Sequence, residues 1–244
     1  MPGFVPAFLI MSLRFDYIVS KIRPDSIGTA DIGTDHGYVP VMLAKSGYSG
    51  NIIASDINIK PLKKAIRNAE AESLSDRIDF VLSDGLSNID RDKIDTVVIC
   101  GMGAELICRI LDNCEWILDR KYSLILQPAS RPEILVYWLD NNGFNITEDR
   151  FICENGRLFR FISCRFENTA PKASEVDLFC GLRAVCKDNE LYLYSLKKCR
   201  RIINSIIQGM NTSVTDFSGE LSFYTGLLGN IDEVISEVDN GKQT

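Results

Sequence analysis

The sequence predicts an α/β fold in which a mostly parallel sheet ends in an antiparallel hairpin and is followed by a helical hairpin. Three observations predict this architecture. From Ile27 to about Glu167, short apolar runs alternate with helix-like stretches, as in sheets buried between helices. An Asn-Gly pair joins the last two runs, which is a strong hairpin signal. Beyond Pro171 only helical spacing remains.

The alternating part predicts five strands with helices between them. Each strand candidate is a short apolar run bounded by Gly, Asp or Pro, which is typical of buried parallel strands. Asn58 is a suitable N-cap residue for the second helix, and Gly143 suits the position after the last one. The expected strands are 27–32, 51–56, 78–82, 96–100 and 123–127, and the expected helices are 38–46, 59–73, 104–113 and 131–142.

The alternating part closes with strand-like runs at 145–153 and 158–166. Five α/β units closed by an antiparallel hairpin are the usual layout of the class I, Rossmann-like methyltransferase sheet. A dinucleotide-binding domain more often continues with another crossover. We therefore expect a catalytic domain over 1–170 and a helical domain over 171–244. Residues 1–10 are interpreted as an extension or an upstream-start artefact, with Met11 as an alternative start to Met1.

The region from Tyr192 to Val238 predicts two helices in a coiled-coil-like hairpin. Apolar residues recur at alternating spacings of four and three, as in a coiled-coil seam, and a polar link at 209–219 lets the helices fold back. We expect the pair to lie on the catalytic domain or on RNA; alternatively, the seams only pack and have no functional role. The seam residues are Tyr192, Leu196, Cys199, Ile203 and Ile206, then Leu221, Tyr224, Leu228, Ile231, Ile235 and Val238.

Composition limits the classes of function. The 244 residues carry a net charge of −6, which does not indicate nucleic-acid binding overall. Eight cysteines without a C-x-x-C pair and a single histidine argue against a zinc site or a disulfide framework, so we expect no metal and a reducing cytoplasm. No run is long and apolar enough for a membrane span. Two basic clusters stand out: Lys60, Lys63, Lys64 and Arg67, then Lys197, Lys198, Arg200 and Arg201.

The glycine turn after the first strand predicts a cofactor cradle. It reads Asp31-x-Gly33-x-x-x-Gly37, and such turns let backbone N–H groups approach a ligand. Asp35 stands where the dinucleotide fingerprint has glycine. Carboxylates disfavour a phosphate ligand and suit a cationic one, such as S-adenosylmethionine. The alternative is a tight turn that Asp35 merely caps.

Acids and glycines follow the other strands at the edge where open α/β sheets bind ligands. Asp56 ends the second strand, where an acid usually bonds ribose hydroxyls, and Asp84 follows the third, where a carboxylate can accept from an adenine amino group. Cys100 is interpreted as a buried strand residue. The expected cofactor-binding residues are Asp31, Ile32, Gly33, Gly37, Asp56, Ile57, Asp84, Gly85, Leu86, Gly101, Met102 and Gly103.

Four motifs resemble one family in order and spacing. They are Asp31-Ile-Gly-Thr-Asp-His-Gly-Tyr-Val-Pro40, Asp84-Gly-Leu86, Gly101-Met-Gly103 and Leu126-Gln-Pro128. The chain is similar here to the bacterial tRNA (adenine-N1)-methyltransferases that modify adenine 22, over residues 13–166 and more loosely beyond. It departs from them at Gly37, at Ala104 and near the N-terminus, where only Arg14 remains of an expected basic pair.

The resemblance implies S-adenosylmethionine as the methyl donor and tRNA as the partner. Adenine N1 is unprotonated at neutral pH and needs no strong base, while the product ring is cationic. We expect Asp35 to stabilise that charge, and His36 and Tyr38 to orient the base or the cofactor. Arg14, Lys197, Lys198, Arg200 and Arg201 are the expected RNA contacts. The alternatives are methylation of another RNA or a small molecule, a catalytically silent binding module, and, least favoured, a nicotinamide oxidoreductase.

Overall fold

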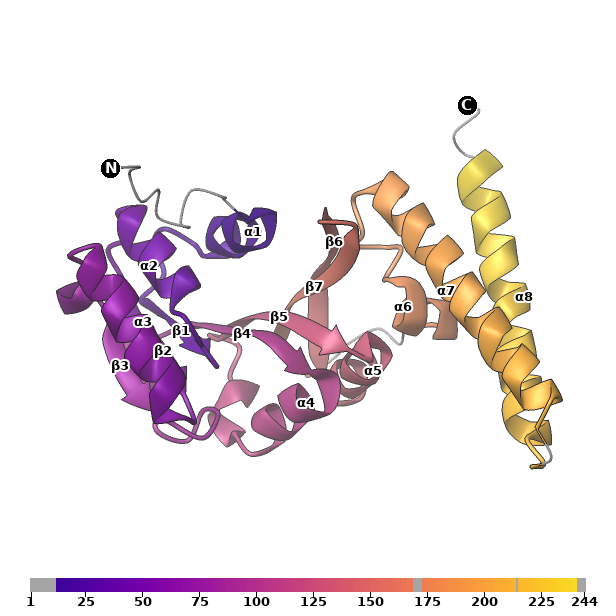
Figure 1. Cartoon of the computed structure of the whole chain (residues 1–244), viewed down its shortest axis with the longest axis horizontal. Helices are drawn as coiled ribbons and strands as arrows, with labels where there is room; N and C mark the ends of the chain where they lie inside the picture. Colours follow the sequence, from indigo (N-terminus) through magenta and orange to yellow (C-terminus); the bar gives the residue numbers. More distant parts are fainter. Residues whose placement is uncertain (1–11, 169–172, 214, 241–244) are drawn as a thin grey trace, which may run out of the picture.

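The computed structural model describes residues 12–168, 173–213 and 215–240. The expected extension at 1–10, the start at Met11 and the boundary at Pro171 lie outside these ranges. Figure 1 shows a twisted sheet flanked by helices, with a pair of long helices beyond its last hairpin. Within the described ranges, we find no helix with the length and apolar character needed to cross a membrane.

The sheet has seven strands in the order β3-β2-β1-β4-β5-β7-β6. The first five are parallel, and β7 runs antiparallel to both β5 and β6. The order reverses between β1 and β4, which is the switch point where such sheets bind ligands. The strands are β1 (Gly28–Ile32), β2 (Asn51–Asp56), β3 (Asp79–Leu82), β4 (Thr96–Gly103), β5 (Ser123–Ser130), β6 (Phe144–Glu154) and β7 (Arg157–Phe166).

Two strands run further than their apolar runs predict. β4 and β5 each continue for three residues beyond the predicted end. The two strands stay paired there across register shifts at Met102, which faces Pro128. This extra pairing places the Gly101-Met102-Gly103 segment at the carboxyl end of the parallel strands, the side of the sheet where ligands bind. A glycine-rich segment has no apolar run, so the sequence does not reveal this extension.

Helices cover both faces of the sheet. One core packs Ala54, Val98 and Ile125 against the N-terminal helices, and the opposite core packs Ile53 and Val97 against α4 and α5. Alternate strand residues thus serve opposite faces, as the pleat requires. These helices are α1 (Leu13–Lys21), α2 (Tyr38–Lys45), α3 (Ile59–Ala71), α4 (Ala104–Asp112) and α5 (Pro132–Asn141).

Details at the helix ends differ from the sequence prediction in one respect. Asn58 occupies the N-cap position of α3, but its side chain makes no capping hydrogen bond. Its backbone N–H instead donates to Asp56 Oδ1 at 2.8 Å, so the Asp56 carboxylate stabilises the turn into α3. Gly143 follows α5 with φ of +76°, as expected of a residue that ends a helix.

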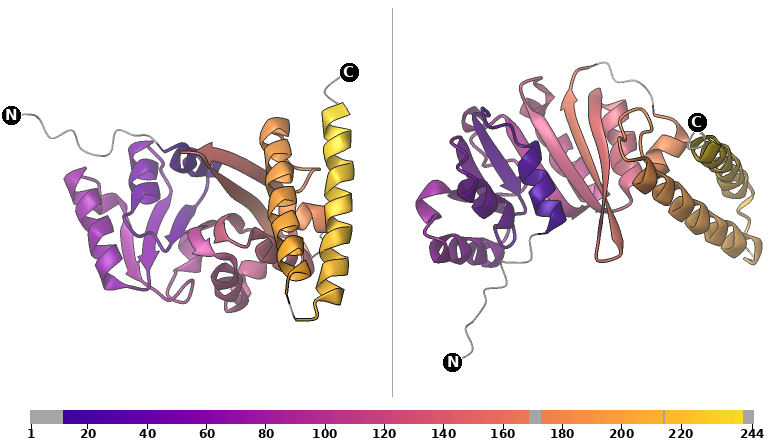
Figure 2. Two further views of the ribbon diagram at one scale, coloured as in Figure 1. Left: turned by 45° about the vertical axis from the view of Figure 1, so that its right-hand side comes forward. Right: turned by 90° about the horizontal axis from the view of Figure 1, so that it is seen from above.

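The C-terminal helices form the predicted antiparallel pair, seen from two further sides in Figure 2. They are α7 (Asn189–Asn211) and α8 (Ser218–Asn240), preceded by the short α6 (Glu175–Cys180). On α7, Tyr192, Leu196 and Ile203 are buried as predicted. On α8 the buried row passes through Leu227 where the sequence pattern placed Leu228, because adjacent apolar residues allow either rotation of the helix.

These helices share a core with the sheet. A buried ion pair in the β6–β7 hairpin also bonds to the backbone of α6 and of the loop after it. Phe151 of β6 packs with residues of α6 and α7. Arg160 of β7, 5% exposed, binds the fully buried Asp149 at 2.6 Å. Arg160 also donates to the carbonyls of Asp177 and Leu178, and Asp149 accepts from the N–H of Leu182. Both charges are therefore satisfied only when α6 and the loop after it are in place.

Candidate functional site

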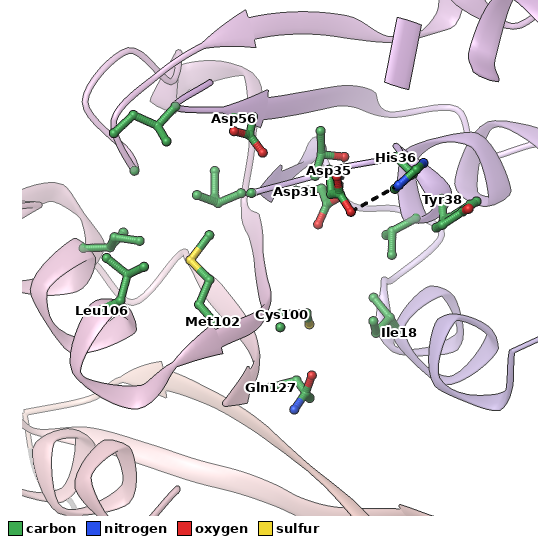
Figure 3. Close-up of a pocket in the computed structure, with 18 of the residues that line it drawn as sticks. Ile18, Asp31, Asp35, His36, Tyr38, Asp56, Cys100, Met102, Leu106 and Gln127 are labelled. Atoms are coloured by element: carbon green, nitrogen blue, oxygen red, sulfur yellow. Dashed lines mark hydrogen bonds and ion pairs between the residues drawn. The ribbon is translucent and has the colours of Figure 1, made fainter. Parts of the chain in front are cut away.

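A cavity of about 590 Å³ opens at the carboxyl ends of the strands. Figure 3 shows acids and aromatic side chains at its top, and Met102, Leu106, Cys100 and Gln127 below them. It receives residues from α1, from the loops after β1 to β3, from the end of β4, and from α4 and β5. It thus lies at the switch in strand order, where the sequence places the site.

The glycine turn after β1 is held against β2 and β4. The N–H groups of Gly33 and Thr34 both donate to the carbonyl of Ser55, at 2.9 and 2.8 Å. Gly33 has φ of +72°, and a Cβ there would lie 2.1 Å from Met102 Cε. Any larger residue would therefore strain the backbone at this positive φ and displace the end of the Met102 side chain, which explains this glycine physically.

Asp31 supplies a buried carboxylate beneath this turn. It is 7% exposed, and among the described residues it forms no ion pair; its partner is the hydroxyl of Thr34, which donates at 2.6 Å. Burial, followed by the charge of Asp56, raises the pKa of Asp31 from 3.8 to about 6. A buried acid without a cation is suited to receive a cationic ligand group.

The two other acids lie along the same wall. Asp56, 8% exposed, uses Oδ1 for the turn into α3 and leaves Oδ2 for another donor. Asp84 is exposed beside Gly85, whose φ of +54° brings its backbone close to Ile110. Ile57 is 58% exposed at the cavity edge. This half of the cavity has the acids and apolar surface that a nucleoside with a cationic substituent needs.

Asp35, His36 and Tyr38 follow Asp31 along the same loop and continue the cavity rim toward α1 (Figure 3). Asp35 adopts φ of +47°, and its carboxylate lies 3.5 Å from His36 Nε2. The His36 ring stacks on Tyr38 with centroids 5.4 Å apart and planes 9° apart, and Phe15 lies 5.3 Å beyond Tyr38. The rim therefore combines an exposed negative charge with an aromatic surface.

Sequence reasoning did not identify the wall that α1 contributes. Phe15 and Ile18 line the cavity beside Arg14. The Arg14 guanidinium binds Glu154 at 2.6 Å and lies 4.3 Å from the Phe159 ring centroid, which fixes α1 to the β6–β7 hairpin. Burial alone would raise the pKa of Glu154, but hydrogen bonds from Ser12 and Arg14 lower it. The apolar spacing of 13–21 was the available signal for this helix.

Two further side chains lie on the floor of the cavity. Gln127, 4% exposed, donates from Nε2 to the carbonyl of Pro128 at 2.7 Å, which leaves its Oε1 available as an acceptor. Cys100 is partly buried, and burial raises the pKa of its thiol, so the neutral thiol is favoured. Cys100 lies in β4 as predicted, but the expectation that it is buried is only partly met, because its side chain lines the cavity.

Most expected site residues converge on the cavity, and some do not. The lining includes Arg14, Asp31, Ile32, Gly33, Asp35, His36, Tyr38, Asp56, Ile57, Asp84, Gly85, Gly101 and Met102. Gly37, Leu86 and Gly103 do not line it: Gly37 packs on Ala65, Leu86 is core, and Gly103 precedes α4. Lys197, Lys198, Arg200 and Arg201 lie on α7, outside the lining.

Comparison with known proteins identifies the family of this chain. A family model described as a methyltransferase domain matches residues 11–162. The tRNA (adenine(22)-N(1))-methyltransferase of Bacillus subtilis is 30% identical over 164 residues, or 67% of this chain and 69% of that one. The structure of M. capricolum TrmK with S-adenosyl-homocysteine superposes with a TM-score of 0.77 at 26% identity, covering 93% and 99% of the two chains. Streptococcus pneumoniae Sp1610 with S-adenosyl-L-methionine gives 0.76 at 25% identity, over 92% and 99%. The chain belongs to the tRNA (adenine(22)-N(1))-methyltransferase family.

Proposed function

We propose that this protein transfers the methyl group of S-adenosylmethionine to N1 of adenine 22 in tRNA. The observation that carries the proposal is the division of one cavity into two halves. One half holds the buried acids Asp31 and Asp56, and the other holds Asp35 beside the aromatic rings of His36 and Tyr38. Since tRNA is the substrate, the protein acts in the cytoplasm.

The first half fits the cofactor chemically. The Asp31 carboxylate has no cation among the described residues, so it can bind the ammonium group of a methionine moiety. Oδ2 of Asp56 can accept from ribose hydroxyls, and Asp84 from the adenine amino group. Ile57 and Leu106 offer apolar surface to the adenine ring. S-adenosylmethionine would supply an electrophilic methyl group at this place.

The second half suits adenine as the acceptor. Adenine N1 carries a free lone pair at neutral pH, so no residue must first remove a proton from it. The ring becomes cationic as the new bond forms, and the Asp35 carboxylate stabilises this charge. Tyr38 and His36 provide a stacking surface for a base that has left its helix.

We assign catalysis to residues 1–170 and RNA docking to 171–244, with Arg14 at the cavity rim. Two of the four cations on α7 already have partners on α8: Lys197 with Asp239 at 3.5 Å, and Arg200 with Asp232 at 2.7 Å. Lys198 and Arg201 therefore remain the stronger candidates for phosphate contacts from this cluster.

Nucleoside mass spectrometry of an unmodified tRNA transcript, incubated with the enzyme and S-adenosylmethionine, tests the proposal. We expect 1-methyladenosine at position 22, located by mapping the digested tRNA. Methylation at another position of the tRNA would show that adenine 22 is not the target. Methylation of a different RNA or a small molecule, with none of the tRNA, would show that tRNA is not the substrate. Cofactor binding without any methyl transfer would instead indicate a catalytically silent module.

A further inference from the structure

The cavity and the α7 cluster do not include the basic residues of α3. Lys60, Lys63, Lys64 and Arg67 all lie on α3, and all four are exposed. None of them forms an ion pair with any residue that the structure describes. We call these four residues the α3 basic face.

The four cations point away from the buried side of α3. Leu62, Ala65 and Ala69 are the buried residues of this helix. At about 100° per residue the four cations fall within an arc of roughly 100°, centred opposite that buried row. The first acid along the helix is Glu70, past the last of the cations. Positive charge is thus concentrated on one side of the helix.

The inner side of α3 is fastened to the loop that carries Asp35 and His36. Gly37 approaches so closely that a Cβ there would lie 2.8 Å from that of Ala65, and Asn68 Nδ2 donates to the carbonyl of His36 at 2.9 Å. The residues just before α3, Ile57 and Asn58, line the cavity. A group held on the outer side of α3 is therefore held at a fixed distance from the site.

The two basic clusters differ in how much charge remains available. On α7, Asp239 and Asp232 neutralise two of the four cations. On α3 no described acid does so, although the chain as a whole carries −6. A patch of unpaired positive charge attracts a polyanion, while the rest of an acidic protein repels it. The polyanion is therefore oriented toward the patch as the two molecules meet.

We propose that the α3 basic face binds the phosphate backbone of the tRNA whose adenine enters the cavity. This assignment rests on the proposed function and adds a docking surface to it. From Lys60 to Arg67 the helix rises by about 10 Å, enough to follow a short stretch of backbone beside the flipped base. Contacts of this kind fix register and position, and the cavity then reads the base.

The test compares two triple variants with equal loss of charge. The first is Lys60→Gln, Lys64→Gln and Arg67→Gln, in which glutamine keeps the helix propensity. The control is Arg91→Gln, Arg120→Gln and Lys121→Gln. These three residues are exposed and precede β4 and β5, at the edge of the sheet opposite the cavity. Thermal unfolding of both variants checks that they fold.

The measurements are tRNA affinity against KCl concentration, S-adenosylmethionine affinity, and the single-turnover rate at saturating tRNA. For the α3 variant we expect tRNA affinity to fall about tenfold or more, and the salt slope to flatten by about 2. Cofactor affinity and the saturated rate stay at wild-type values. The control keeps the wild-type slope.

Equal slopes and affinities in the α3 variant and the control would overturn the assignment. So would a loss of cofactor affinity, because the helix would then act on the cavity itself. If the wild-type protein methylates tRNA while the α3 variant behaves as wild type, only the docking surface is wrong. If the wild-type protein methylates no tRNA, the proposed function fails and the docking surface with it.

Discussion

At the scale of single residues, the buried Asp31 carboxylate lowers the stability of the fold when it is charged, while the same charge suits a cationic ligand. Burial raises its pKa to about 6, so the folded protein keeps a proton that the unfolded chain releases between about pH 4 and 6. The free energy of unfolding therefore falls as pH rises through this window and stays lower above it, by at most roughly 3 kcal/mol. In the proposed function this loss of stability is offset when the charged Asp31 binds the cationic group of the cofactor.

Asp31→Asn should separate the two effects. The cofactor-free variant is expected to melt at a higher temperature than wild type at pH 8, and the difference should vanish near pH 4. S-adenosylmethionine should raise the melting temperature of wild type far more than that of the variant. Differential scanning calorimetry at both pH values measures this, and a variant that melts lower than wild type at pH 8 would contradict it.

Asp35 is expected to affect turnover more than cofactor binding. Asp35→Asn is the appropriate change, because asparagine tolerates the left-handed backbone at φ of +47° while alanine adds strain. We expect the single-turnover rate on tRNA to fall about tenfold to a hundredfold with S-adenosylmethionine affinity retained. A wild-type rate in this variant would remove Asp35 from the chemistry.

Asp56 is expected to act on cofactor affinity directly. Asp56→Ala should weaken S-adenosylmethionine binding by about 1.5–3 kcal/mol, as for the loss of a charged hydrogen-bond partner. Asp56→Asn is the matched control, since its oxygen can still accept from Asn58 N–H and preserve the turn into α3. Calorimetric titration of both variants should show a loss in each; unchanged affinity in a folded alanine variant would exclude this role.

At the scale of elements, the β6–β7 hairpin depends on its buried ion pair. Arg160→Met should lower the free energy of unfolding by about 3–5 kcal/mol, because Asp149 would keep a buried charge without its cation. The double variant with Asp149→Asn should lose less than the sum of the two single changes, since no charge then remains buried. Urea unfolding provides the values, and strict additivity would show that the pair is not coupled.

The sequence predicted the elements whose signals are local. The five strands, the hairpin and the acids Asp31, Asp56 and Asp84 follow from apolar runs and from the residues that end them. The wall formed by α1 was not foreseen, because it depends on a contact between Arg14 and Glu154, 140 residues apart. Gln127, which ends the fifth predicted strand, does line the cavity. The rotation of α8 at Leu227 does not follow from local spacing, because adjacent apolar residues allow either rotation.

At the scale of the whole molecule, the proposed functions place cofactor binding and RNA docking in separate parts of the chain. The cavity lining ends at Phe161, before α6 begins. A chain cut after residue 168 should still bind S-adenosylmethionine, seen as a rise in its melting temperature, and should lose most tRNA methylation. It should also melt well below the full chain, because the cut removes the carbonyls of Asp177 and Leu178 that accept from Arg160 and exposes Phe151. A truncated chain with full tRNA activity would place all docking on the catalytic part.

The uncompensated Asp31 carboxylate has a consequence for the lifetime of the protein in a cell. A ligand that binds only the folded state shifts the unfolding equilibrium by mass action, and here it also neutralises the charge that weakens the fold. Molecules without S-adenosylmethionine should therefore open more often and reach a protease sooner than loaded ones. The abundance of this enzyme would then follow the supply of methyl donor without any regulator, because a single buried acid makes the fold depend on its own reagent.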